Sequence, residues 1–175
     1  MASSLYNSGG LENADLGPFE KSLEVYGIKV IGLGDIGGNE EVEDEFMRKI
    51  AQTTKYLLNP NGEYIDSEAQ EDAIENLKSV DTAQRVGVQA MDTYNPSLDE
   101  DNYEGWDDVN DNHSVNDFVW QYNLDGYNSR TSAEQITEVL EHLLHTITYF
   151  GLTGAYPDQF KSNSDGELIA SGALY

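Results

Sequence analysis

The sequence predicts an α+β fold that is mainly helical and forms a single compact domain. Apolar residues recur at helical spacing in residues 39–58, again from residue 66 onward, and in residues 132–150. β-Branched residues are frequent in residues 23–33 and, in a shorter run, in residues 85–91, as expected of strands. With 175 residues, the chain is long enough for one domain with its own apolar core.

An extended N-terminal arm is expected before the first strand. Residues 1–22 are small and polar, and Gly9, Gly10 and Pro18 interrupt them. Glycine and proline in a polar segment favour turns and irregular structure. The globular domain is therefore predicted to cover residues 23–175.

Capping residues mark the ends of the expected helices. Asn39 can cap the first helix, and either Asp66 or Ser67 begins the second, because these side chains accept hydrogen bonds from free N–H groups. Thr131 opens a capping-box pattern before the third helix. Gly151 is placed to end that helix, since glycine readily adopts the left-handed conformation.

Residues 92–130 are expected to form a long acidic loop rich in aromatic side chains. The aromatic residues include Tyr94, Tyr103, Trp106, Phe118, Trp120 and Tyr122. A loop of this length inside a compact domain usually has a function or contacts a partner. Tyrosine also supplies contact area at modest entropic cost, so we expect this loop to be an interaction surface.

The net charge narrows the classes of partner. The chain has 33 acidic and 9 basic residues, a formal net charge of -24, and no lysine or arginine lies between Arg85 and Arg130. Such a surface repels nucleic-acid phosphates and anionic lipid headgroups. We therefore expect no binding to nucleic acid. We expect cationic partners, divalent metal ions or a salty medium that screens the repulsion between the acidic residues of the chain.

The sequence has no features of a membrane or secretory segment. The first 22 residues lack the basic and apolar regions of a secretory signal, and no apolar run is long enough to span a bilayer. The absence of cysteine excludes disulfides and thiolate metal sites. We expect a protein that is made in the cytoplasm without membrane insertion and that acts there or in a virion or extracellular particle released by lysis.

A glycine-rich segment, "GLGDIGG", has the G-x-G-x-x-G spacing of dinucleotide-binding loops. Gly32, Gly34 and Gly37 follow an expected strand and precede an expected helix, which is the context that such loops require. A pyrophosphate, however, needs the positive end of the next helix, and residues 40–45 are mostly acidic. No second strand is expected to complete a βαβ unit. We interpret the glycines as a flexible turn and assign no cofactor-binding residue.

The third helix carries charged and apolar residues on different sides. Glu138, Glu141, His142 and His145 fall within about 100° of one another at the helical period. They are either four ligands that converge on one metal ion or the solvated face of an ordinary surface helix, and the sequence leaves both open. The side expected to face the core consists of Ile136, Val139, Leu140, Leu143, Ile147 and Phe150.

Residues 138–151, which include "EHLLH", resemble the active-site helix of zincin metallopeptidases. That family has H-E-x-x-H, in which two histidines bind Zn²⁺ and the glutamate is the general base. Here the first two positions are interchanged. His145 matches the second histidine, Glu141 takes the place of the first ligand, and His142 takes that of the base. The resemblance implies a zincin-like helix whose catalytic chemistry is lost or altered.

Calcium is the second candidate ion after zinc. The pattern Asn-x-[Asn/Asp]-Gly occurs at residues 59–62, 123–126 and 163–166 and matches part of an EF-hand loop. The first ligand position fails each time, so tight turns are the alternative interpretation. The acidic residues 99–117 are a more general calcium candidate. His113 within them is either a further metal ligand or a solvated loop residue.

These features favour a non-catalytic structural or interaction subunit over an enzyme. No G-x-S-x-G or other nucleophile motif is present, so no catalytic residue is assigned. We expect a self-assembling homo-oligomer that contacts other protein subunits of a virion or extracellular particle. Its scaffold is expected to be degenerate zincin-like, with calcium as a candidate stabilising ion. The alternative is a zinc-dependent peptidase or hydrolase that uses Glu141 and His145.

Overall fold

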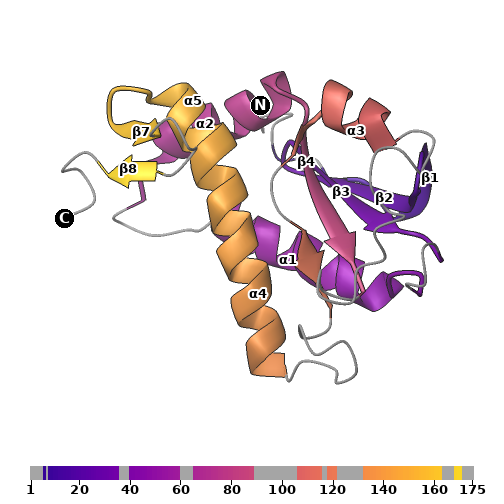
Figure 1. Ribbon diagram of the computed structural model, residues 1–175. Coiled ribbons are helices and arrows are strands. Elements are labelled where there is room, and N and C mark those ends of the chain that lie inside the picture. Colours follow the sequence, from indigo (N-terminus) through magenta and orange to yellow (C-terminus); the bar gives the residue numbers. More distant parts are fainter. Residues whose placement is uncertain are drawn as a thin grey trace.

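The fold centres on a mixed sheet of six strands with helices on both faces (Figure 1). The computed structural model describes residues 6, 8–35, 40–59, 65–88, 106–115, 118–121, 132–162 and 168–170. Among these residues, 50% are helical and 27% lie in strands. The protein is therefore a compact α+β fold, and the prediction of a mainly helical one is wrong because the sheet is its central layer.

The sheet combines an antiparallel half with a parallel half. β1 (Glu12–Leu16), β2 (Phe19–Val25) and β3 (Ile28–Leu33) are neighbours in antiparallel order. β4 (Thr82–Gly87) lies beside β3 and parallel to it, and the short strands β5 (Ser114–Val115) and β6 (Val119–Trp120) both pair with β4 in parallel. Near the C-terminus, β7 (Phe160–Ser162) and β8 (Leu168–Ala170) form a separate antiparallel pair.

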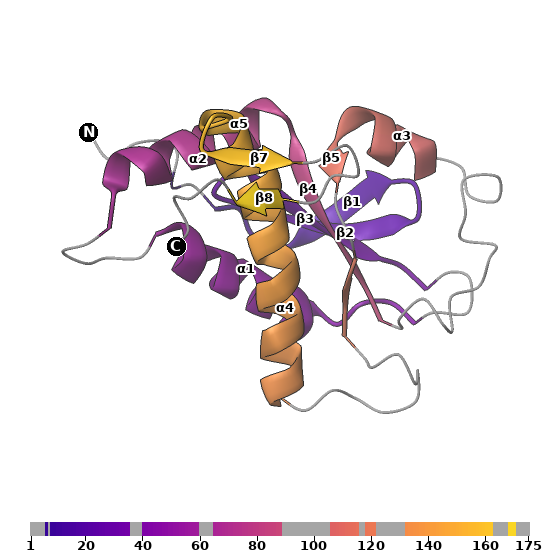
Figure 2. The same ribbon diagram turned by 60° about the vertical axis from the view of Figure 1, so that its left-hand side comes forward.

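The helices cover the sheet from two sides. They are α1 (Asp44–Leu58), α2 (Ser67–Ser79), α3 (Trp106–Asn112), α4 (Ser132–Thr146), the π-helix η4 (Ile147–Leu152) and α5 (Thr153–Ala155). Gly32 in β3 faces Met47 of α1, and Gln84 in β4 bonds to α4, so these two helices share one face. Arg85, the next residue of β4, contacts Asn110 of α3, which places α3 on the opposite face (Figure 2).

The two helices that follow β3 begin in different ways. Asp66 caps α2, as predicted, and its carboxylate accepts hydrogen bonds from the N–H groups of Glu68 and Ala69, each at 3.1 Å. α1 begins at Asp44 without a side-chain cap, several residues after the predicted cap at Asn39. Its first turn is acidic, and negative charge there favours the positive end of the helix dipole. Charge therefore supports the start of α1 in place of a cap.

The predicted N-terminal arm is wrong. Residues 12–16 and 19–25 form β1 and β2, so the boundary drawn at residue 23 falls inside a strand of the sheet. Pro18, one of the residues that suggest irregular structure, lies with Gly17 in the turn between these strands, and Gly17 has a φ of 61°. Phe19 in β2 is fully buried, and its packing in the core ties this segment to the sheet.

The run of residues 23–33 predicts one strand, and the structure divides it into two. Tyr26 and Gly27 form a two-residue turn with φ values of 48° and 86°. Positive φ at both central residues is typical of a type I′ hairpin, whose twist matches that of the strands. A tyrosine rarely adopts this conformation, so the turn has a weak signal in the sequence. The Tyr26 ring packs edge-on against Tyr6, with 5.4 Å between the ring centroids.

The third predicted helix continues past the glycine expected to end it. α4 passes directly into η4 and α5, and Gly151 lies inside η4. A Cβ atom on Gly151 would lie 3.3 Å from both the Ala73 carbonyl oxygen and Leu77 Cγ of α2. Asn76 of α2 donates a hydrogen bond to the Phe150 carbonyl oxygen. Gly151 therefore permits the close approach of α2 and does not stop the helix.

Part of the predicted acidic loop folds into the core. Within residues 92–130 the structure describes residues 106–115, which include α3 and β5, and residues 118–121, which include β6. Phe118 and Trp120 stack with their ring centroids 4.6 Å apart, and the Arg85 guanidinium lies 4.7 Å from the Phe118 centroid. These two aromatic residues therefore serve the core, contrary to the prediction of a partner surface. Tyr94, Tyr103 and Tyr122 lie outside the described residues.

Gly27→Ala is expected to lower the free energy of unfolding by more than about 1 kcal/mol. The turn needs a positive φ, and the added Cβ would lie 2.6 Å from Lys78 Cγ. Gly10→Ala is the matched control, since a Cβ there would meet no described atom within 4 Å. Urea denaturation of the two variants measures the difference. Equal stability would contradict the close packing of the hairpin turn on α2.

Candidate functional site

α4 packs on the sheet with part of the apolar side that its sequence predicts, but the helix is rotated relative to that prediction. Val139, Leu143 and Ile147 are buried, as expected, but Ile136 is 58% exposed. Glu138 is only 9% exposed, although the sequence places it on the solvated side. The helix is therefore rotated so that a row of polar residues faces the protein.

Glu138 lies against the end of β6. Its carboxylate accepts a hydrogen bond from the Trp120 N–H at 3.1 Å, and its Oε1 atom is 3.4 Å from Nε2 of His142. Both side chains are largely shielded from solvent. A buried N–H group needs an acceptor, and the Glu138 carboxylate of α4 is the acceptor for the N–H at the end of β6. Glu138 therefore has a structural role at the junction of α4 and β6.

The same row of α4 continues with Thr146. Its hydroxyl donates a hydrogen bond to Oε1 of Gln84 in β4 at 2.8 Å, and both side chains are fully buried. Glu138, His142 and Thr146 are four residues apart, so they form a stripe along the helix. We call this stripe, with its partners Trp120 and Gln84, the polar seam. The polar seam fixes the rotation of α4 about its axis, because any other rotation would leave the Trp120 N–H and the Gln84 side chain buried without these hydrogen-bond partners.

The four predicted metal ligands do not converge. Glu138 and His142 belong to the polar seam, whereas Glu141 and His145 are exposed. Within the described ranges, no group of three or more histidine, aspartate and glutamate side chains is arranged to hold a metal ion. A catalytic zinc ion uses three protein ligands, and Glu141 with His145 supplies only two.

The other predicted ion sites fall mainly outside the described residues. The EF-hand-like patterns at residues 123–126 and 163–166 lie there, and of residues 59–62 only Asn59, which ends α1, is described. His113 follows α3, and its Nδ1 atom is 3.1 Å from the backbone oxygen of Asp81. Calcium binding therefore stays a prediction.

Close packing explains one of the three glycines in the "GLGDIGG" segment. A Cβ on Gly32 would lie 3.0 Å from Sδ of the buried Met47, whereas a Cβ on Gly34 would meet only the end of the exposed Glu20 side chain, which can move aside. Gly37 lies outside the described residues. The expectation that no second strand follows is wrong, since β4 runs parallel to β3 after α1 and α2. The acidic start of α1 is confirmed, and it remains unfavourable for a pyrophosphate.

Lys21 of β2 ties the sheet to the start of α1. Its ammonium group donates to the Val42 carbonyl oxygen at 2.7 Å and lies 2.9 Å from Glu41 and 2.8 Å from Asp44. Burial alone would lower the pKa of Lys21, but its hydrogen bonds to the two carboxylates raise it overall. The same hydrogen bond from Lys21 lowers the pKa of Asp44. This cluster holds the acidic end of α1 against the sheet.

A groove of about 240 Å³ lies between α1 and α4. Lys49 of α1 donates a hydrogen bond to Gln135 of α4 at 3.4 Å and so links the two helices. Phe46 and Val139 contribute buried apolar side chains, and Ile136 contributes an exposed one. We call this surface the α1–α4 groove; its lining residues are Phe46, Lys49, Gln52, Thr53, Gln135, Ile136 and Val139.

Comparison with known proteins assigns no family to the chain. No protein-family model matches it, and neither a curated protein nor a solved structure is similar enough to count as a match. The resemblance of residues 138–151 to zincins therefore stays a prediction. In the part of the chain that the structure describes, no helix is both long and apolar enough to cross a membrane.

Glu138→Ala is expected to lower the free energy of unfolding by about 1–3 kcal/mol, because the Trp120 N–H would stay buried without its acceptor. Glu138→Gln keeps an oxygen acceptor and should lose less. Glu141→Ala, on the exposed side of the same helix, should change stability by less than about 0.5 kcal/mol. Chemical denaturation compares the three variants. A larger loss in Glu141→Ala than in Glu138→Ala would refute the polar seam.

Lys21→Met is expected to raise the titration midpoint of Asp44, since it removes the hydrogen bond that lowers the pKa of this carboxyl. In the wild type, the stabilisation from this pair is fully present above the ordinary aspartate pKa of about 3.9. It is lost as the pH falls through the lowered folded-state value. An NMR titration of the Asp44 carboxyl carbon measures the midpoint. Lys49→Met is the control, because Lys49 pairs with Glu45 and should leave the Asp44 midpoint unchanged.

Proposed function

We propose that the protein is a non-catalytic subunit of a homo-oligomeric assembly, and that copies of the chain associate through the α1–α4 groove. The observation that carries this proposal is Ile136, a groove residue that is 58% exposed beside buried apolar side chains. Full burial of an apolar side chain of this size is worth about 1.5–3 kcal/mol. A second copy that covers the groove would gain part of this free energy.

One further exposed apolar side chain lies on the α1 side of the groove. Tyr56 of α1 is 70% exposed and lies seven residues after Lys49, which places it on the side of α1 that lines the groove. Single exposed apolar residues are ordinary, but a group of them beside a groove is typical of a contact surface.

Charge favours a second copy as the occupant of this surface. α1 has three basic residues against two acidic ones, a local charge of +1, whereas the whole chain has a net charge of -24. α2 and α4 each contain more acidic than basic residues. Another copy of this acidic chain therefore meets less repulsion at α1 than at either of these helices. The basic residues of α1 are Arg48, Lys49 and Lys55.

The alternative, a zinc-dependent peptidase or hydrolase, has less support. Its two ligands, Glu141 and His145, are exposed, and the neighbouring candidates Glu138 and His142 are committed to the polar seam. A location in a virion or extracellular particle stays a prediction from the sequence.

Light scattering over a range of protein concentrations tests self-association. The wild-type chain is expected to have a mass above the 19.4 kDa of one copy. Ile136→Asp puts a charge into the groove and should weaken association by at least about tenfold, or 1.4 kcal/mol. Because Ile136 is exposed, the variant should stay folded. Val80→Asp is the matched control, since Val80 is also exposed, at 36%, but does not line the groove.

Two results would count against the proposal. A wild-type protein that stays a single copy at every concentration would overturn it, and so would equal masses for wild type and Ile136→Asp. Metal analysis and a peptidase assay test the alternative. Stoichiometric zinc, with peptide cleavage that a Glu141→Ala, His145→Ala double variant loses, would establish the enzyme in place of the structural subunit.

A further inference from the structure

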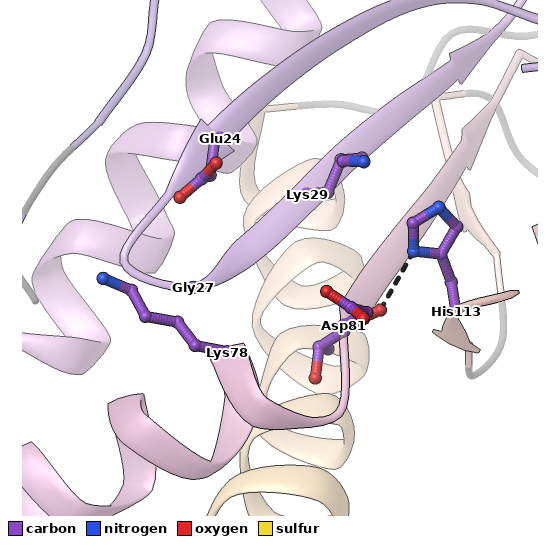
Figure 3. A pocket seen from close by; sticks show the side chains of 7 residues that line it. Glu24, Gly27, Lys29, Lys78, Asp81 and His113 are labelled. Carbon is purple, nitrogen blue, oxygen red and sulfur yellow. Dashed lines mark hydrogen bonds between the residues drawn. The ribbon is translucent and has the colours of Figure 1, made fainter.

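A second cavity, of about 250 Å³, lies where β3 and β4 begin (Figure 3). The end of α2, the β2–β3 hairpin and the residue after α3 form its walls together with these strands. The polar seam is a different site, because its partners are Trp120 at the end of β6 and Gln84 in β4. Among the described residues, none lines both this cavity and the α1–α4 groove. Its lining includes Glu24, Lys29, Lys78, Asp81, Thr82 and His113.

Basic groups collect at this cavity in an otherwise acidic protein. Lys29 and Lys78 are two of the nine basic residues of the chain, and His113 is one of its three histidines. The Lys29 side chain makes no hydrogen bond or ion pair with any described residue, whereas the side chains of Lys21 and Lys49 each pair with carboxylates. An ammonium group in a partly enclosed site attracts an anion more strongly than it would in open solvent.

The backbone holds the His113 imidazole in place at the cavity. Its Nδ1 atom is 3.1 Å from the backbone oxygen of Asp81, and this oxygen also accepts the Ser114 N–H at 3.2 Å. With Nδ1–H donating to the carbonyl, Nε2 can donate to an anion only when the ring carries its second proton, so the imidazolium form is the one that binds an anion. Figure 3 shows Lys29 extending from β3 toward the side on which His113 lies. A group bound there would contact side chains from two separate elements.

We propose that this cavity binds a small oxyanion, a carboxylate or phosphate group, between the Lys29 ammonium and the protonated His113 imidazolium. Hydrogen bonds from charged donors to an oxyanion are stronger than those between neutral groups. Glu24 and Asp81 also line the cavity, and their charges disfavour a ligand with more than one negative charge. A singly charged carboxylate is thus expected to bind more tightly than phosphate, which is partly dianionic at pH 7.5.

An NMR titration of the full, isotopically labelled chain tests this site. Sodium acetate and sodium phosphate are added separately at constant ionic strength, with sodium chloride as the reference. The His113 ring and Lys29 side-chain signals are expected to shift with acetate and, more weakly, with phosphate. The exposed His145 should stay unchanged. Lys29→Gln should weaken acetate binding at least tenfold, whereas Lys49→Gln, a lysine of the α1–α4 groove, should bind as the wild type does.

The outcomes separate this site from the proposed assembly. Shifts at His113 that saturate and depend on Lys29 support the site, and the tighter of the two anions identifies the ligand class. Equal shifts with chloride, or undiminished binding by a folded Lys29→Gln variant, would overturn it. Lys29→Gln should also leave the assembly mass unchanged, because Lys29 does not line the groove. Failure of self-association would therefore leave the oxyanion site standing, and the reverse also holds.

Discussion

The position of α4 depends on two buried hydrogen bonds that anchor it to the sheet. The Trp120 N–H donates to Glu138 near the first half of the helix, and Thr146 donates to Gln84 at its end. Each buried polar group would cost about 1–3 kcal/mol if it lost its partner, so the two bonds together permit one rotation of the helix. That rotation decides which apolar residues of α4 reach the core and leaves Ile136 outside it.

The same constraint connects the fold to the proposed function. A surface helix of a monomer normally buries its apolar side and exposes its polar side. α4 departs in part from this arrangement, because the polar seam is buried while Ile136 is exposed. Ile136 lines the groove beside α1, which has a local charge of +1 in this acidic chain. Contact with a second copy would restore the usual arrangement by covering Ile136.

Local signals predict part of this structure, and long-range contacts decide the rest. The start of α2 at Asp66 follows from capping chemistry within a few residues, so the sequence is sufficient for it. The division of residues 23–33 into a hairpin depends on packing against α2, which no local pattern reveals. The polar row that starts at Glu138 looks like a solvated face until its partner N–H in β6 is known. Lys29 and His113 line the same cavity only because the sheet brings their elements together.

The reactivity of two histidines of α4 tests this account most directly, because the rotation of the helix separates them. Modification by diethyl pyrocarbonate, followed residue by residue with mass spectrometry, reports how accessible each imidazole is in the folded chain. The polar seam predicts fast modification of the exposed His145 and much slower modification of His142, which lies against Glu138. Equal rates, or a faster rate at His142, would show that α4 presents a different side to the sheet and would remove the basis for the groove.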